Sequence, residues 1–135
     1  MEVSDADLLT MAKTIYGEAR GESTEGKIAV AWVIRNRLAR PKRFGLTVGA
    51  VCRQPFQFSC WNLHDPNLPK LKAVTSTDPS FSECQEIAAK VCSDKIPDPT
   101  NGAQFYRVIG TPADWAIDHS PCYEVGAHEF FNDVN

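Results

Sequence analysis

Apolar residues recur every three or four positions near the start of the chain, which predicts an amphipathic helix. The residues that would share its apolar face are Leu8, Met11, Ala12, Ile15 and Ala19. Ser4, followed by Asp7 three positions later, is a suitable cap for the beginning of this helix. Gly21 follows Arg20, near which the helix should end. Glu18 then falls at the edge of the apolar face, where an ordinary solvated carboxylate is also expected.

A second helix is predicted from Ser23 or Thr24 to a point before Pro41. Its segment IAVAWVI, residues 28–34, is apolar almost all the way round, which is typical of a central core helix. TVGAVC, residues 47–52, predicts one short helical turn. The loop QPFQFSCWN, residues 54–62, follows, and its aromatic rings suit either stacking on sugar rings or filling of the core.

The last half of the chain predicts one more helix and then strands. An apolar stripe from Phe81 to Cys92 indicates a core helix, capped by Asp78 or Ser80. DPTNGA, residues 98–103, is a turn signature, and Asp65 and Asp98 are assigned turn roles beside prolines. QFYRVI and YEVGAHEFF have β character and should pair as an antiparallel hairpin or sheet. We therefore expect an α+β fold, mainly helical, with a small antiparallel β element near the C-terminus.

The composition favours one compact globular domain spanning residues 1–135, since 43% of the residues are hydrophobic and 23% are charged. A net charge of -3 gives no general attraction to nucleic acid or to an anionic membrane. No apolar run reaches the length of a membrane span, and the acidic N-terminus does not resemble a Sec signal. We therefore expect synthesis in the cytoplasm, no nucleic-acid or membrane partner, and a monomer.

Cysteine and histidine usage argues against a metal site. The five cysteines form no CxxC pair and are odd in number, which predicts reduced and mostly buried thiols. The three histidines show no HExxH spacing, so a metal-dependent amidase or endopeptidase is disfavoured, and we expect no metal and no cofactor. A Cys–His peptidase built from Cys60 and His128 remains formally open, although neither residue has the context of an activated thiol.

Four segments together resemble the SleB-type cell wall hydrolases, a family of spore-cortex lytic enzymes and related phage and bacterial enzymes. They are IYGEARGESTEGKIAVAWVIRNR (residues 15–37), QPFQFSCW (54–61), DPTNGAQFY (98–106) and VGAHEFF (125–131), in the family's order. The resemblance implies a compact lysozyme-like fold, related to the transglycosylases, with the substrate in a cleft. It also implies that Glu18, the first glutamate of the E-A-R-G-E motif, is the catalytic residue.

The chemistry of glycan cleavage is compatible with that role for Glu18. Breaking a β-1,4 glycosidic bond requires a carboxylic acid that is still protonated near neutral pH, and apolar surroundings favour that form. A hydrolase normally needs a second carboxylate, whereas a lytic transglycosylase uses the same one twice and releases a 1,6-anhydro-muramic product. Glu22 is the nearest second carboxylate, but Gly21 makes a shared helix face doubtful. The resemblance therefore favours a muramidase-type transglycosylase, with a hydrolytic muramidase as the alternative.

Substrate contacts are predicted from residues in the segments that resemble the family. The candidates are Glu22, Gln57, Phe58, Ser59, Trp61, Tyr106 and His128. Structural roles compete with several of them, because Glu22 could be a surface or capping carboxylate and His128 an internal hydrogen-bonded histidine. The basic end of the second helix, where five cations lie within residues 35–43, could be a solvated helix end or a contact for acidic wall peptides.

The expected partner is peptidoglycan, and the expected role is that of a phage endolysin or particle-associated lysin. Such a protein would act at the cell wall or periplasm after a holin or another route let it out of the cytoplasm. The rival from another class is a catalytically silent wall-binding or virion structural module that kept the fold.

Overall fold

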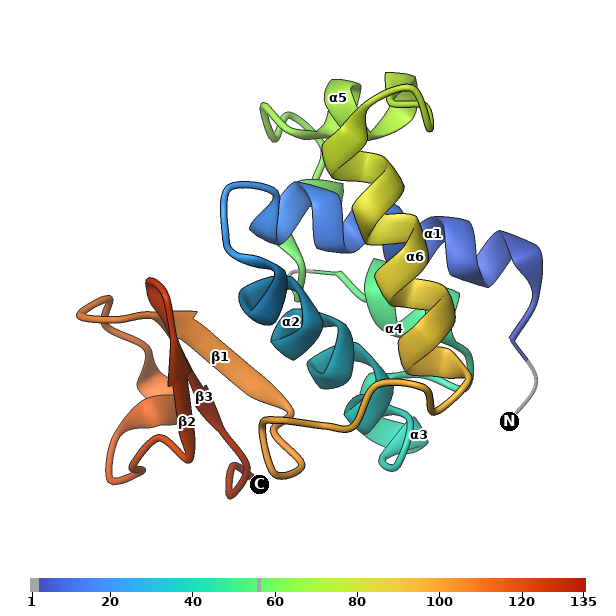
Figure 1. Cartoon of the computed structure of the whole chain (residues 1–135). Helices are drawn as coiled ribbons and strands as arrows, with labels where there is room; N and C mark the ends of the chain where they lie inside the picture. Colours follow the sequence, from blue (N-terminus) through green and yellow to red (C-terminus); the bar gives the residue numbers. More distant parts are fainter. Residues whose placement is uncertain (1–2, 56) are drawn as a thin grey trace.

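The computed structural model describes residues 3–55 and 57–135 and has the predicted α+β architecture. In chain order the elements are α1 (Asp5–Ala19), α2 (Thr24–Arg37), α3 (Pro41–Phe44), α4 (Val48–Arg53), the 3-10 helix η1 (Ser59–Trp61), α5 (Leu68–Ala73), α6 (Pro79–Cys92), β1 (Phe105–Val108), the 3-10 helix η2 (Asp114–Ala116), β2 (Tyr123–Val125) and β3 (His128–Phe131). The helices form one body, and the small sheet lies to one side of it, next to α2 (Figure 1).

Helix α1 begins and ends as its sequence predicts. The Ser4 hydroxyl accepts a hydrogen bond from the Asp7 amide, and the apolar positions 11, 12, 15 and 19 are buried. In the same way, Ser23 caps α2 through Gly26, and Asp78 caps α6 through the amides of Ser80 and Phe81. A polar side chain thus satisfies free amides at the start of each long helix.

Helix α2 is the central helix, as its apolar sequence indicates. It packs against α1, α4 and α6 on one side and β1 on the other, and the residues from Ala29 to Ile34 are all buried. The short helices α3 and α5 were not predicted, because each is built around a proline at its first or second position and carries too few residues for a periodic pattern.

The C-terminal strands form one antiparallel sheet in the order β1-β3-β2. The segment YEVGAHEFF is a hairpin of β2 and β3, with a turn at Gly126, whose φ of 57° suits glycine. Tyr106 of β1 lies opposite Phe130 of β3, and Phe105 lies opposite Phe131. Phe130 packs with Ala29, Val30 and Val33 of α2, whereas Trp115 packs on Phe105 and Phe131 from the other face.

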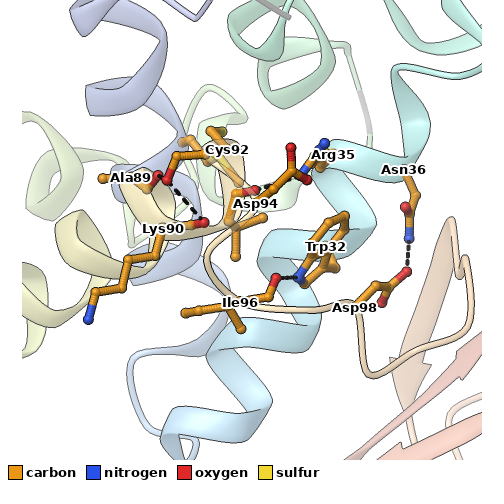
Figure 2. A network of polar contacts seen from close by, with 12 residues as sticks. Trp32, Arg35, Asn36, Ala89, Lys90, Cys92, Asp94, Ile96 and Asp98 are labelled. Atoms are coloured by element: carbon orange, nitrogen blue, oxygen red, sulfur yellow. Dashed lines mark hydrogen bonds and ion pairs between the residues drawn. The ribbon is translucent and has the colours of Figure 1, made fainter.

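The chain between α6 and β1 is tied to α2 by polar contacts (Figure 2). The Trp32 indole donates to the Ile96 carbonyl over 3.1 Å, and Arg35 pairs with Asp94. Asn36 donates to Asp98, which also accepts from the backbone amides of Thr100 and Gly102. This confirms the turn role of Asp98, and the turn delivers the chain into β1 beside α2.

The five cysteines are all free thiols, with Cys52, Cys60 and Cys84 buried and Cys92 and Cys122 half-buried. The predicted burial is therefore confirmed for most of the cysteines, and their reduced state stays a prediction. Along residues 3–55 and 57–135, no helix combines the length and apolar character that crossing a bilayer would require.

Candidate active site

Glu18 lies in the last turn of α1, half-buried, and two groups donate hydrogen bonds to its carboxylate. The Tyr106 hydroxyl donates to Oε1 over 3.0 Å. The Cys60 backbone amide donates to Oε2 over 3.4 Å, a weaker contact. The Glu18 carboxylate thus connects α1 to Tyr106 of β1, which lies 88 positions later in the chain, and to the aromatic loop.

Gly17 allows the aromatic loop to approach Glu18 so closely. A β-carbon at Gly17 would lie 2.6 Å from Cys60 Cβ and 2.8 Å from its Sγ. No larger residue fits there without movement of η1. The glycine therefore sets the distance between α1 and the Cys60 amide that reaches Glu18.

The sheet holds the Tyr106 ring in place. Its centroid lies 5.5 Å from that of Phe130, in a stacked arrangement, and 5.4 Å from that of His128, edge to face. Both neighbours are on β3, and the β1–β3 register places them beside Tyr106. The hydroxyl that reaches Glu18 is consequently carried on a ring with little freedom to turn.

Burial, together with the Glu18 charge and hydrogen bond, raises the pKa of Tyr106 well above its usual value of 10. Burial, and then the same Glu18 charge, raises the pKa of Cys60 as well. At neutral pH Tyr106 is therefore a hydroxyl donor, and Cys60 is a neutral thiol. A Cys60-based peptidase is disfavoured, because the thiolate is the reactive form.

Glu18 opens onto a cavity of about 360 Å³. Its walls are Glu18, Arg37, Arg43, Gln57, Phe105, Tyr106 and Trp115. The cavity combines one carboxylate, aromatic rings on which a sugar face can stack, and amide and guanidinium donors. Such a set suits acid catalysis on a polar, uncharged or anionic substrate.

Arg37 is the most deeply buried charged residue of this cavity, with 4% of its surface exposed. Its Nε donates to the Gln104 carbonyl over 2.8 Å, and its Nη1 to Gln57 Oε1 over 3.3 Å. Its guanidinium also lies 4.7 Å from the Phe44 ring centroid and 5.0 Å from that of Phe58. Burial lowers its pKa from 12.5 to about 10, so Arg37 remains a cation at neutral pH.

Glu22 and His128 contact each other rather than this cavity. The Glu22 carboxylate oxygen Oε1 lies 3.0 Å from His128 Nδ1 and accepts from the Ala127 amide over 3.2 Å. His128 is buried, and its ring touches Tyr106. The pair connects the loop after α1 to the β2–β3 turn. His128 is thus an internal hydrogen-bonded histidine, the structural role that competed with substrate binding in the sequence analysis.

The structure places the described candidate residues of the aromatic loop in different surroundings, and only one of them lines the cavity of Glu18. Gln57 is exposed and lines the cavity of Glu18, whereas Phe58 is in the core with 1% exposure, beneath Arg37. Ser59 is exposed at the start of η1. Trp61 donates to the Thr14 hydroxyl over 2.8 Å and lines a different hollow of about 480 Å³. Phe56 lies outside the described residues.

Sequence reasoning missed Phe105 and Trp115 as cavity residues, and it grouped Arg37 and Arg43 with a basic helix end. A signal for Arg37 exists, because it follows Val33 and Ile34 by four and three positions and so continues the buried face of α2. No comparable signal marks Trp115, whose position depends on packing against Phe105 and Phe131. Over the part of the chain that is described, no group of three or more His, Cys, Asp or Glu residues could hold a metal ion.

A family model described as Cell Wall Hydrolase matches residues 21–131, a range that begins just after Glu18. The chain is 45% identical over 130 residues to the spore cortex-lytic enzyme of Bacillus subtilis (strain 168), covering 94% of this chain and 38% of that protein. It is 48% identical over 130 residues to the spore cortex-lytic enzyme of Oceanobacillus iheyensis, covering 94% of this chain and 42% of that protein. The chain thus spans well under half the length of these curated relatives.

Two solved structures share the fold. The catalytic domain of the Bacillus cereus SleB protein superposes with a TM-score of 0.73 at 27% identity, covering 96% of this chain and 92% of that one. The catalytic domain of the germination-specific lytic transglycosylase SleB from Bacillus anthracis gives 0.71 at 26% identity, covering 95% of each chain. These likenesses extend over both the helical body and the sheet that carries Tyr106.

Proposed function

The chain belongs to the cell wall hydrolase family, and we propose that it cleaves the glycan strands of bacterial peptidoglycan as a lytic transglycosylase with Glu18 as catalytic residue. The observation that carries this function is the Glu18 carboxylate, held by Tyr106 and opening onto the cavity. We take residues 1–135 to act as one catalytic domain on N-acetylmuramic acid to N-acetylglucosamine bonds.

In the first step, Glu18 acts as a general acid. Tyr106 donates to Oε1 over 3.0 Å, whereas Oε2 receives only the weaker 3.4 Å contact from the Cys60 amide, so we assign the transferable proton to Oε2. Oε2 gives this proton to the glycosidic oxygen, and the bond from that oxygen to C1 of the muramic residue breaks. An oxocarbenium-like centre and an ionised Glu18 result, and Tyr106 stabilises the new carboxylate by continuing to donate to it.

In the second step, the ionised Glu18 acts as a general base. It takes the proton from the C6 hydroxyl of the muramic residue, and O6 bonds to C1 to form the 1,6-anhydro product. The step returns Glu18 to its protonated form and consumes no water. Two glutamates that could be considered as a second carboxylate are already engaged, which supports this route: Glu22 is held by His128, and Glu129 is paired with Arg107.

Other candidate contacts follow from the geometry. Gln57 can donate to an acetamido or hydroxyl group of the substrate, and Trp115 and Phe105 offer ring faces to a sugar. Tyr106 is better assigned to positioning Glu18 than to binding a sugar. Three of the candidates would not touch the substrate and would only support neighbouring side chains: Glu22, His128 and Phe58. Two others, Ser59 and Trp61, would contact only a glycan strand that extends beyond the cavity.

Mass spectrometry of the muropeptides released from purified peptidoglycan tests residue and mechanism together. We expect 1,6-anhydro-muramic ends from the wild type and a loss of roughly 100-fold or more in rate for Glu18→Gln. Glu25→Gln, an exposed glutamate at the start of α2, is the matched control and should cleave normally. Reducing muramic ends would select the hydrolytic muramidase instead. Binding to sacculi without any glycan product would select the silent wall-binding module.

For the biological setting, we propose a phage endolysin or particle-associated lysin that needs a holin or another export route. Expression in an intact bacterial host should then cause lysis only when a membrane-permeabilising partner is present. Lysis by the chain alone would contradict this. Because the relatives are named spore cortex-lytic enzymes, spore cortex and vegetative sacculi should be compared as substrates.

A further inference from the structure

Three arginines surround a single aromatic ring beside the cavity of Glu18. The guanidinium carbons of Arg37, Arg40 and Arg43 lie 4.7, 5.3 and 5.2 Å from the ring centroid of Phe44. Among the ion pairs formed within residues 3–55 and 57–135, none involves any of the three. Like charges gathered together are costly, and among the described residues Glu18 is the one carboxylate that lines the cavity with Arg37 and Arg43, so this cluster creates a local positive potential in a chain of net charge -3.

The three guanidinium groups differ in how they are occupied. Arg40 donates to Gln104 Oε1 over 2.7 Å and to the Val134 carbonyl over 2.8 Å, which fixes it to the C-terminal segment. Arg37 is buried and donates to Gln104 and Gln57. Arg43 is exposed, and no hydrogen bond of its guanidinium is found within the described residues.

Arg43 is nevertheless held at the cavity. Its guanidinium carbon lies 4.9 Å from the ring centroid of Phe105, and both residues line the cavity of Glu18. Stacking on two aromatic rings leaves the edge of a guanidinium, with its N–H donors, available for a planar anion. The guanidinium carbon of the buried Arg37 lies 5.3 Å from the same Phe105 ring centroid and adds a second positive charge on the interior side of the cavity.

A cation at this place does not assist bond cleavage itself. The transition state of glycoside cleavage carries positive charge at the reacting carbon, which a neighbouring guanidinium would oppose. The positive potential is better suited to an anionic part of the substrate. A muramic residue carries one close to the scissile bond, because its lactyl group ends in a carboxylate or continues into a stem peptide that has carboxylates.

We propose that Arg43, backed by the buried Arg37, binds a carboxylate attached to the muramic residue and so orients the glycan strand against Glu18. This inference rests on the proposed function, and it assigns the site a preference for strands that carry such a carboxylate. Bidentate pairing with a carboxylate is the geometry that arginine favours.

The test is steady-state cleavage of soluble glycan strands prepared in three forms. The first keeps its stem peptides, the second is stripped by an amidase so that the lactyl carboxylates are free, and the third has its carboxylates converted to amides. Wild type, Arg43→Gln, Arg43→Lys and Lys42→Gln are compared on each. Lys42 is the matched control, since it is the exposed neighbouring cation on α3 and does not line the cavity.

Loss of a charge-assisted pair should raise KM about ten-fold or more for Arg43→Gln on carboxylate-bearing strands, with kcat within about two-fold. On amidated strands, wild type and Arg43→Gln should have the same KM. Arg43→Lys should recover part of the affinity, and Lys42→Gln should match the wild type. An effect on stripped strands identifies the lactyl carboxylate, and an effect confined to intact strands identifies a stem-peptide carboxylate.

An unchanged KM for a folded Arg43→Gln on both charged substrates would overturn the role of Arg43. So would a wild-type KM that does not respond to amidation. Neither result affects the proposed function, which fails separately if the wild type cleaves none of the three substrates or if cleavage survives Glu18→Gln. Thermal melting of each variant distinguishes lost binding from lost folding.

Discussion

At the scale of single residues, the site depends on how one carboxylate is held. Glu18 Oε1 receives its hydrogen bond from Tyr106, whose raised pKa, due to burial and then to the Glu18 charge, keeps the hydroxyl protonated at neutral pH. In the proposed mechanism the same hydroxyl donates to Glu18 in both of its protonation states, and it favours Oε2 as the oxygen that carries the transferable proton.

Tyr106→Phe should lower kcat about ten-fold or more and change KM much less. It removes the hydroxyl that orients Glu18 but keeps the ring that packs on Phe130 and His128. Initial rates of muropeptide release at several substrate concentrations measure both constants. Tyr16→Phe is the matched control, because its hydroxyl also donates to a carboxylate, that of Asp78, over 2.9 Å. The control should affect melting temperature and leave kcat near wild type; equal loss of kcat in both variants would refute a specific role for Tyr106.

At the scale of elements, the end of α1 must lie close to the aromatic loop for the Cys60 amide to reach Glu18. The Trp61–Thr14 hydrogen bond draws the loop onto α1, and the missing side chain of Gly17 makes room for Cys60 there. Gly21, four residues later, has open space around it, with nothing within 4 Å of an added β-carbon. Gly17 and Gly21 therefore provide a matched pair of sites for alanine substitution, one crowded and one open.

Gly17→Ala should destabilise the fold by about 1–3 kcal/mol, because its methyl group would overlap Cys60. Its kcat should also fall, since η1 must move away from Glu18. Gly21→Ala should be neutral or slightly stabilising, because alanine reduces the freedom of the unfolded chain. Urea unfolding followed by circular dichroism gives both free energies. A stable and fully active Gly17→Ala would show that the loop accommodates the methyl group without cost.

The long helices were predictable from the sequence because their caps and apolar periods are local. Ser4, Ser23 and Asp78 cap the helices that the pattern predicted. Helices α3 and α5 were missed, since a single turn beside a proline carries no period. The resemblance to a family singled out Glu18 and Tyr106, but not their hydrogen bond. Trp115 and the cavity role of Arg43 depend on long-range packing, which no local pattern records.

At the scale of the whole molecule, the candidate site lies where the helical body meets the sheet. Glu18 and Arg37 come from α1 and α2, whereas Tyr106 and Phe105 come from β1. The hydrogen bond from Tyr106 to Glu18 therefore depends on how the sheet packs against the helical body. Buried thiols lie on the helical side of this boundary, in α4 and α6, and they make the stability of the fold dependent on pH.

Alkaline pH should destabilise the reduced protein through these thiols. Burial raises the pKa of Cys52 from 9.0 to about 12 and that of Cys84 from 9.0 to about 11. A group whose pKa is higher in the folded state contributes stability that is complete below the unfolded pKa and is lost as pH rises toward the folded value. Each such thiol should therefore lower the free energy of unfolding by up to about 1.4 kcal/mol per pH unit above pH 9.

The loss of stability through ionisation of the buried thiols is best measured between pH 9 and 10. Above about pH 10 the buried Arg37 works in the opposite direction, because its lowered pKa lets the folded state lose a proton that the unfolded state keeps. Urea unfolding in the presence of a phosphine reductant, repeated at steps of pH, measures the slope. Cys84→Ala should have a shallower slope than the wild type even if its stability at pH 7 is lower, because one titrating thiol is gone. A slope that Cys84→Ala leaves unchanged would mean that this thiol already ionises in the folded molecule, so that the packing of α6 admits water to it.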